Sequence, residues 1–266
     1  MSKKIITRTE FKNELLDCGE KMALDTKLQK DALDLLVRAD HYKWVHQTSW
    51  LGEPILNIPH DMFALQEIIY RTRPEYIIEV GVAWGGSLLF YSTLMEVLGG
   101  EKIIGIDIFV PDDLVERIDS HGRLSDRIEW VVGSSIEEET VNKVKEIIGD
   151  SRNTMILLDS YHTHDHVLKE LQLYSQFVGK GCYLICGDTI VENIPEQKHR
   201  PREWGPGNNP KTALKEFLKK NDRFKIDKDL FEHLETETRE KFKDYIIKIL
   251  AERLDNLNDI IIKSKI

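Results

Sequence analysis

Short apolar runs alternate with amphipathic segments along most of the chain. Five runs rich in β-branched residues predict buried strands. These runs are 76–80, 102–109, 127–133, 155–158 and 182–186. Apolar positions at helical spacing predict helices at 61–71, 87–98, 167–178 and 211–220, and a short strand follows at 224–226. This alternation favours an α/β fold with a doubly wound, mostly parallel sheet.

The two ends of the chain carry helical patterns instead. Residues 8–40 predict one or two amphipathic helices, and the spacing from 236 to the end, through Ile261, predicts a C-terminal helical extension. The expected organisation is an N-terminal helical or lid segment (1–60), a central α/β domain (61–230) and the extension (231–266). The aromatic, turn-rich segment 41–59 suits a lid or an oligomer contact, and equally an ordered loop that covers the sheet.

Composition narrows the possible partners. The 266 residues have a net charge of -9, which argues against nucleic acid as the main partner because phosphate binding needs a basic face. No secretory signal precedes residue 30 and no apolar run reaches membrane-spanning length, so we expect a soluble protein with no membrane partner. Three cysteines without framework spacing favour a reducing cytoplasm.

The stretch YIIEVGVAWGGS (76–87) ends the first predicted strand in a glycine-rich turn. Glycines allow a ligand to approach the backbone closely, and such turns lie where open α/β sheets bind ligands. Ala83 occupies the place of the second glycine of a dinucleotide loop, and Glu79 lies two residues before Gly81. The turn therefore resembles motif I of class I S-adenosylmethionine (SAM) methyltransferases, although an ordinary strand-to-helix turn is the alternative. The candidate cofactor-binding residues are Glu79, Gly81, Gly85, Ser87, Asp107, Ser134 and Ser135.

Three of these positions lie at the ends of later strands. Asp107 ends the second strand, where a carboxylate can accept both hydroxyls of a ribose. Ser134 and Ser135 follow the third strand and could contact adenine. Alternatively, Ser134 is a helix N-cap, with Glu137 at capping-box spacing.

Asp159 and Asp188 end the fourth and fifth strands, so both should face one crevice. Paired carboxylates suit a hard divalent cation such as Mg2+, which can lower the pKa of a substrate hydroxyl. Each aspartate could instead cap the next helix.

Three histidines, His162, His164 and His166, crowd the end of the fourth strand. We predict that His162, together with Asp159, acts in catalysis by taking a proton from a substrate hydroxyl. Local packing is the alternative for each histidine, and His166 is expected to begin the helix. His164 is a candidate substrate contact. The α/β pattern counts against a non-haem iron site.

A long, basic, proline- and glycine-rich loop spans 194–210. Arg200 and Arg202 could bind a phosphate or carboxylate of the substrate. A solvated positive loop is an equally good interpretation.

Six motifs appear in order over 48–230: TSWLG, PHDM, EVGVAWGGS, LDSYHTHDHVLKELQLYSQFVGKGCYLI, GDT and GPGNNPKTALKEFL. Together they resemble the cephalosporin hydroxylase family, which has a SAM-dependent methyltransferase fold and is similar to sugar and natural-product O-methyltransferases. The resemblance implies SAM at 79–87 with Asp107 on its ribose, and a divalent metal near Asp159 and Asp188.

The chain departs from that family at two places. The family's Glu-Asp pair after the fifth strand is Gly187-Asp188 here, so one expected metal ligand is missing. The usual Gly-aromatic-Leu strand motif near the C-terminus is also missing, and a charged helical extension is predicted in its place.

The sequence thus predicts a metal-assisted, SAM-dependent O-methyltransferase acting on a sugar, nucleotide sugar or similar small polar metabolite, as a homo-oligomer. Two alternatives stay open. One is a hydroxylase, as the family label says, and the other is a non-catalytic SAM- or nucleotide-binding subunit that supports a partner enzyme.

Overall fold

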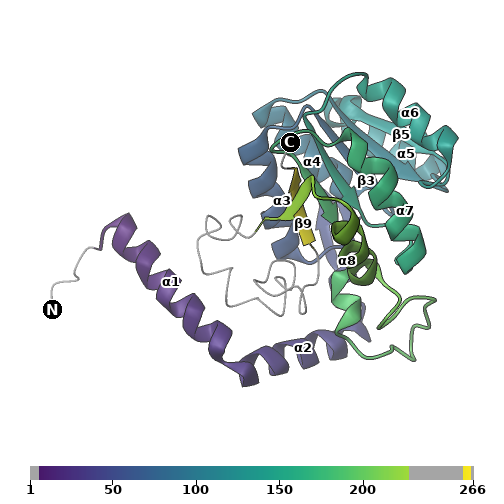
Figure 1. Ribbon diagram of the computed structural model, residues 1–266. Coiled ribbons are helices and arrows are strands. Elements are labelled where there is room, and N and C mark those ends of the chain that lie inside the picture. The colour runs from purple at the N-terminus through teal and green to yellow at the C-terminus, as the bar shows by residue number, and fades with distance from the viewer. Residues whose placement is uncertain (1–5, 228–259, 265–266) are drawn as a thin grey trace.

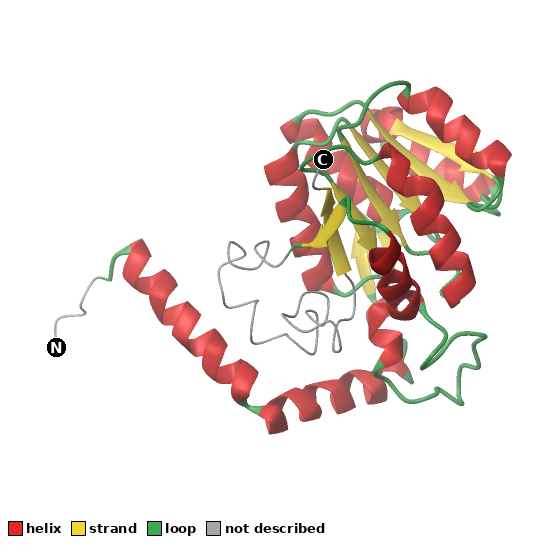
Figure 2. Ribbon diagram, in the orientation of Figure 1, coloured by secondary structure: helices red, strands yellow, loops and turns green. Residues whose placement is uncertain are grey.

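A seven-stranded, mostly parallel sheet forms the centre of the protein (Figure 1, Figure 2). The computed structural model describes residues 6–227 and 260–264. The strand order is β5-β4-β3-β6-β7-β9-β8, and β3, β4, β5, β6 and β7 are parallel to one another. The strands of this sheet are β3 (Tyr76–Val80), β4 (Lys102–Asp107), β5 (Ile128–Val132), β6 (Thr154–Leu158), β7 (Tyr183–Cys186), β8 (Phe224–Ile226) and β9 (Ile260–Ser264).

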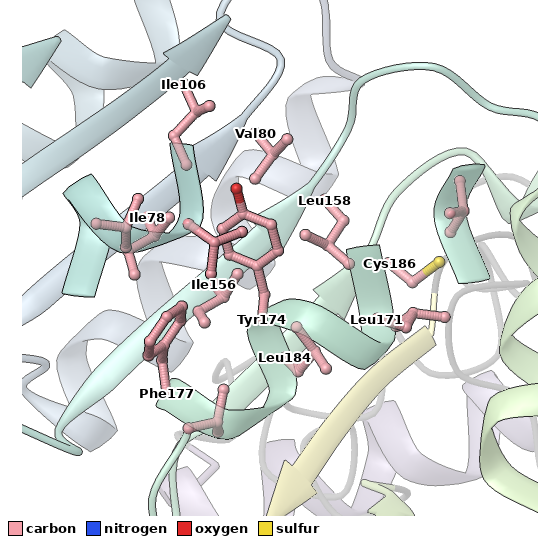
Figure 3. Close-up of a cluster of buried hydrophobic side chains, with 14 of the residues drawn as sticks. Ile78, Val80, Ile106, Ile156, Leu158, Leu171, Tyr174, Phe177, Leu184 and Cys186 are labelled. Carbon is pink, nitrogen blue, oxygen red and sulfur yellow. The ribbon is translucent and has the colours of Figure 1, made fainter. Parts of the chain in front are cut away.

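Helices cover both faces of the sheet, as the predicted doubly wound fold requires. Because successive side chains of a strand point to opposite faces, Ile77 packs under α3, α4 and α5 while its neighbour Ile78 packs under α6, α7 and α8. Figure 3 shows the second of these cores, where Tyr174 and Leu171 of α7 lie against Ile156 and Leu158 of β6. The helices are α1 (Arg8–Leu24), α2 (Thr26–Asp40), α3 (Pro59–Thr72), α4 (Gly86–Leu98), α5 (Asp112–Asp119), α6 (Glu138–Ile148), α7 (His164–Tyr174) and α8 (Pro210–Lys220).

The strand register brings the ends of three strands to the same level. Val80 of β3 pairs with Leu158 of β6, which pairs with Cys186 of β7. The chain after β3 enters α4 on one face of the sheet, whereas the chain after β6 enters α7 on the other. The two connections therefore diverge and leave a crevice at the carboxyl ends of the strands, which is where open α/β sheets bind ligands.

Four short 3-10 helices and a small hairpin complete the described structure. The hairpin consists of β1 (Thr48–Trp50) and β2 (Glu53–Ile55) and packs on α4. It follows α1 and α2, of which α1 extends away from the sheet (Figure 1). The segment 41–59 thus contains an ordered hairpin, and its role as a lid or an oligomer contact stays a prediction. The 3-10 helices are η1 (Trp44–His46), η2 (Gly122–Arg127), η3 (Ser175–Phe177) and η4 (Thr189–Glu192).

The expectation of a helix running to the chain end is wrong at 260–264. These residues form β9, which pairs antiparallel with both β7 and β8 and so belongs to the central sheet. A run of three isoleucines suits a strand as well as a helix, because β-branched side chains favour the pleated surface. The rest of the predicted extension, 228–259, lies outside the described residues. Within the described part of the chain, no helix is long and apolar enough to cross a membrane.

A substitution at Gly81 tests how closely β3 and β6 approach. Gly81 has φ +90°, and a Cβ there would lie 2.2 Å from the carbonyl oxygen of Asp159. Gly81→Ala should therefore destabilise the fold in two ways. The alanine must adopt a positive φ, and its Cβ clashes with the backbone of Asp159. Gly52 is the matched control, because it has φ +97° with nothing within 4 Å of its Cβ position. In urea denaturation, Gly81→Ala should lose at least about 2 kcal/mol more stability than Gly52→Ala. Equal losses would show that the strand ends separate easily.

Candidate active site

A cavity of about 720 Å³ lies in the crevice at the ends of β3, β4, β6 and β7. Its volume falls in the range of small-molecule and cofactor sites. The sheet supplies one wall, which includes Gly81, Asp107, Asp159 and Asp188. The end of α2, the segment around the β1–β2 hairpin and the loop 194–206 supply the opposite wall.

The glycine-rich turn after β3 is held by a buried glutamate. Glu79 is 1% exposed, and its carboxylate accepts hydrogen bonds from the Ser87 hydroxyl at 2.7 Å and the Tyr91 hydroxyl at 3.1 Å. Burial raises the pKa of Glu79 to about 7, against the opposing effect of these two hydrogen bonds. Glu79 therefore fixes the start of α4 relative to β3 while it also lines the cavity.

Asp107 links the ends of β3 and β4 at the cavity wall. One of its carboxylate oxygens accepts from the backbone N–H of Val82 at 3.0 Å, and the other from the N–H of Phe109 at 3.2 Å. Its carboxylate thus lies beside the turn at 81–85, at the position expected for a ribose contact.

Three side chains at the ends of β6 and β7 form a candidate metal centre. Asp159, His162 and Asp188 each offer one ligand atom, and these atoms all lie within 4.8 Å of one another. The His162 Nε2 is 3.2 Å from the Asp188 Oδ2, and its ring packs edge-on against Trp204 with centroids 5.0 Å apart. The two aspartates expected to converge from separate strands do so, and the histidine predicted as a base lies between them and the loop.

A third carboxylate, Asp61, adds to this cluster and was missed by the sequence interpretation. It lies in the first turn of α3 and lines the cavity, and its Oδ1 is buried without a hydrogen-bond partner among the described residues. Burial, then the charges of Asp188 and Asp159, raise the pKa of Asp61 well above its ordinary value. An acid near a helix start suits the helix dipole, so the sequence alone suggested no other role. The PHDM motif was the available signal.

Burial also raises the pKa of Asp159, to about 7, with Asp188 adding to the increase and His162 opposing it. Asp188 therefore disfavours the charged form of Asp159, and both aspartates disfavour the charged form of Asp61. This electrostatic strain is what a bound cation would relieve.

The outer wall is tied together by an ion pair between segments far apart in sequence. Asp40, at the end of α2, accepts from Arg200 Nη2 and bonds His199 Nε2, each at 2.7 Å. The His199 ring stacks on His41 with centroids 3.7 Å apart. Figure 1 shows the light-green loop after η4 beside the end of α2.

Residues 42–248, well over half of the chain, match the family described as Rhamnosyl O-methyltransferase/CmcI. The chain belongs to this family. The resemblance drawn from the sequence motifs is thereby confirmed.

Individual relatives share limited identity with this family member. A rhamnosyl O-methyltransferase of Mycobacterium bovis (strain BCG / Pasteur 1173P2) is 24% identical over 166 residues, which are 60% of this chain and 66% of the relative. One of Mycobacterium leprae (strain TN) is 26% identical over 167 residues, 60% of this chain and 70% of the relative. The chain thus spans slightly less than two thirds of the first relative's length.

Among solved structures, "cmcI-D160 Mg-SAM" is similar with a TM-score of 0.51 and 17% identity, and covers 83% of this chain and 78% of that one. "CmcI-N160 apo-structure" has the same TM-score and identity, with coverage of 83% and 77%. These likenesses confirm the predicted fold.

Gly187 gives this CmcI family member an unusual arrangement beside β7. A Cβ at position 187 would lie 2.7 Å from the Asp159 Oδ1. The Asp159 carboxylate therefore occupies space that a side chain at 187 would need. The carboxylate that the resemblance led us to expect at 187 is absent, and His162 is the third potential ligand.

Two other predicted positions, His164 and Ser134, have surroundings that differ from those expected. The side chain of His164 faces α8, where its Nδ1 lies 2.8 Å from the Thr212 hydroxyl, and it does not line the cavity. Ser134 is not a helix cap, because α6 begins at Glu138 with Glu137 as its N-cap. Nor does Ser134 line the cavity, whereas Ser135 does.

A buried network behind Ser135 was also not predicted. Glu170 of α7 is fully buried, and one of its oxygens accepts from the hydroxyls of Ser135 and Ser160, each at 2.5 Å. The same oxygen lies 3.1 Å from the Nε2 of His166. His166, expected to begin the helix, lies in the first turn of α7 and lines the cavity. Glu170 thus holds three cavity-lining side chains in place.

The raised pKa of Asp159 predicts a pH-dependent stability. The folded pKa of about 7 exceeds the ordinary value of 3.8, so the folded state holds a proton that the unfolded state releases between these values. Stability is therefore greatest at low pH and is lost as the pH rises through about 7. The melting temperature of metal-free protein should fall from pH 5 to pH 8.

Saturating Mg2+ should raise that melting temperature at pH 8 and change it little at pH 5. Asp159→Asn should reduce both effects, although Glu79 keeps part of the pH dependence because it titrates in the same range. A melting temperature that responds to neither pH nor Mg2+ would contradict the charge cluster. Differential scanning fluorimetry provides the measurement.

The ion pairs of Asp40 are expected to stabilise the position of the loop in the outer wall of the cavity. Asp40→Asn removes the charge that Arg200 and His199 share, and a hydrogen bond to a charged group contributes about 1.5–3 kcal/mol. Hydrogen exchange of the amides in 197–202 should accelerate at least about tenfold. Asp34→Asn is the control, because Asp34 pairs with Lys30 on the exposed side of α2. Equal exchange in both variants would mean that the loop keeps its position without Asp40.

Proposed function

We propose that this chain is a SAM-dependent O-methyltransferase that methylates a hydroxyl of a sugar, a nucleotide sugar or a related small polar metabolite. One observation carries the proposal: the glycine-rich turn, Asp107 and the Asp159–His162–Asp188 cluster face a single cavity. Membership of the Rhamnosyl O-methyltransferase/CmcI family supports the same activity. The similar structure "cmcI-D160 Mg-SAM", named for Mg and SAM, supports it as well.

The residues at the ends of β3 and β4 fit a SAM molecule. Gly81 has positive φ and no space for a Cβ, which keeps the backbone of the turn close to the cavity. We propose that Asp107 binds the ribose hydroxyls, that Ser135 lies at the adenine end, and that Glu79 and Ser87 hold Gly81 and Gly85 in position. We make no such proposal for Ser134, since it lies outside the cavity lining.

The carboxylates at the ends of β6 and β7 fit a divalent cation. Asp61 adds a buried carboxylate oxygen without a described partner, which is a further sign that positive charge belongs here. We assign Asp159 and Asp188 to the cation because Mg2+ prefers oxygen ligands. When bound, the cation lowers the pKa of a neighbouring hydroxyl.

We propose that His162 accepts the proton of the substrate hydroxyl. Its Nε2 lies 3.2 Å from the Asp188 Oδ2, so the Nε2–H donates to that carboxylate and Nδ1 is left to accept a proton. The substrate oxygen attacks the methyl carbon of SAM, the electron pair of the C–S bond stays on sulfur, and the hydroxyl proton moves to His162 Nδ1. Holding both reactants in line can supply about 7–11 kcal/mol of the barrier reduction.

This assignment predicts that the histidines differ in importance. His162→Ala should lower kcat by about 10²–10⁴-fold, because the general base is lost. His164→Ala is the control, since its imidazole faces α8 outside the cavity. Conversion of SAM to S-adenosylhomocysteine is measured with a panel of sugars, sugar phosphates and nucleotide sugars. If His162→Ala keeps wild-type kcat, the proton assignment is wrong.

Calorimetric titration with S-adenosylhomocysteine tests the proposal as a whole. A protein that does not bind this nucleoside cannot be the proposed enzyme. Binding without turnover of any acceptor would favour the non-catalytic subunit. Neither a flavin nor an iron motif was found in the sequence, so we do not propose a hydroxylase.

We further propose a cytoplasmic role in carbohydrate biosynthesis as a homo-oligomer. The three cysteines, Cys18, Cys182 and Cys186, show no spacing typical of a disulfide framework, which fits a reducing compartment. Apolar side chains on α1 and α2, including Phe11, Leu24 and Leu35, are exposed and suit a contact between copies.

A further inference from the structure

The two arginines that line the cavity differ in how their charge is neutralised. Arg200 donates from Nη2 to Asp40, but its Nε is buried without a hydrogen-bond partner among the described residues. Arg202 forms no ion pair within 6–227 or 260–264 that the structure describes. Its guanidinium lies over the ring of Trp204, 5.1 Å from the centroid. The cavity wall thus offers N–H donors, among them a guanidinium that forms no ion pair with the described residues.

These donors lie close to the proposed reacting centre. The Trp204 ring contacts Arg202 on one side and packs edge-on against His162 on another. A single indole therefore separates the Arg202 guanidinium from the imidazole proposed to take the proton. If the hydroxyl of a small acceptor lies at His162, a second group a few bonds from that hydroxyl would reach Arg202.

The electrostatics of the wall point to an anion. Burial lowers the pKa of Arg202 and the charge of Arg200 lowers it further, while the charges of Asp188 and Asp40 oppose this decrease. A negative group bound between the two guanidinium groups would favour the charged form of Arg202. The planar guanidinium also matches the two oxygens of a carboxylate or phosphate.

We propose that Arg202 and the Nε of Arg200 form an oxyanion subsite, so that the acceptor carries a phosphate or carboxylate near the methylated hydroxyl. This inference rests on the proposed methyltransferase function and specifies its substrate class. A neutral glycoside lacks the group that this subsite binds, so it is a poorer ligand.

The experiment measures binding rather than turnover. Full-length protein saturated with S-adenosylhomocysteine is titrated by calorimetry with glucose 1-phosphate, glucuronate, methyl glucoside and inorganic phosphate. Arg202→Gln removes the free guanidinium. Lys198→Gln is the matched control, because Lys198 lies in the same loop, is exposed and does not line the cavity.

Wild-type protein should bind at least one of the two charged sugars about tenfold or more tightly than methyl glucoside. Arg202→Gln should remove this preference and weaken inorganic phosphate by a similar factor, while Lys198→Gln changes either affinity less than about twofold. The two charged sugars distinguish a phosphate from a carboxylate.

Equal weakening in Arg202→Gln and Lys198→Gln would overturn the subsite, since it would reflect the net charge of the loop. Absence of any preference for charged ligands in wild-type protein would overturn it too. Affinity for S-adenosylhomocysteine is measured on the same samples. If wild-type protein does not bind S-adenosylhomocysteine, the proposed function is refuted. If it binds S-adenosylhomocysteine but shows no preference for charged sugars, only the subsite is refuted.

Discussion

Repulsion among carboxylates at one end of the sheet is the constraint on which the site depends. Asp61, Asp159 and Asp188 come from a helix start and two strand ends. Asp188 disfavours the charged form of Asp159, and both of them disfavour the charged form of Asp61. Water cannot fully screen them, because the Asp61 oxygen is buried. Folding brings them together nonetheless, since the apolar faces of α3, β6 and β7 are buried in the core. Burial of the hydrophobic core thus supplies the free energy that holds these like charges close together. A bound cation would reduce their electrostatic repulsion.

Glycine determines how close these groups come. Gly81 allows β3 to approach the backbone carbonyl of Asp159, and Gly187 leaves room for the Asp159 carboxylate. A side chain at either position would push Asp159 away from its neighbours. The absence of a side chain at 187 therefore explains the position of Asp159, because the Asp159 carboxylate occupies the space that such a side chain would need. His162 lies beside Asp188 in the same cluster, with its Nε2 3.2 Å from the Asp188 Oδ2.

Local patterns predicted the parts of the molecule whose position follows from the sheet. Asp107, Asp159 and Asp188 were identified because a residue that ends a parallel strand must lie at the carboxyl edge. Asp61 could not be identified in this way, since only the packing of α3 brings it there. His164 illustrates the converse, because one turn of α7 separates a side chain facing α8 from neighbours that line the cavity. The strand at 260–264 was missed because its isoleucines also fit a helical spacing.

The two walls of the cavity differ in how they are held. Strand ends and buried bonds such as Glu79 to Ser87 position the cofactor side, so that side is rigid. The acceptor side consists of the end of α2 and a loop joined by the Asp40 ion pairs. Loops on a rigid scaffold are where binding specificity changes most easily. The proposed oxyanion subsite lies on this loop, so a change in the loop can alter which acceptor binds without altering the strand ends.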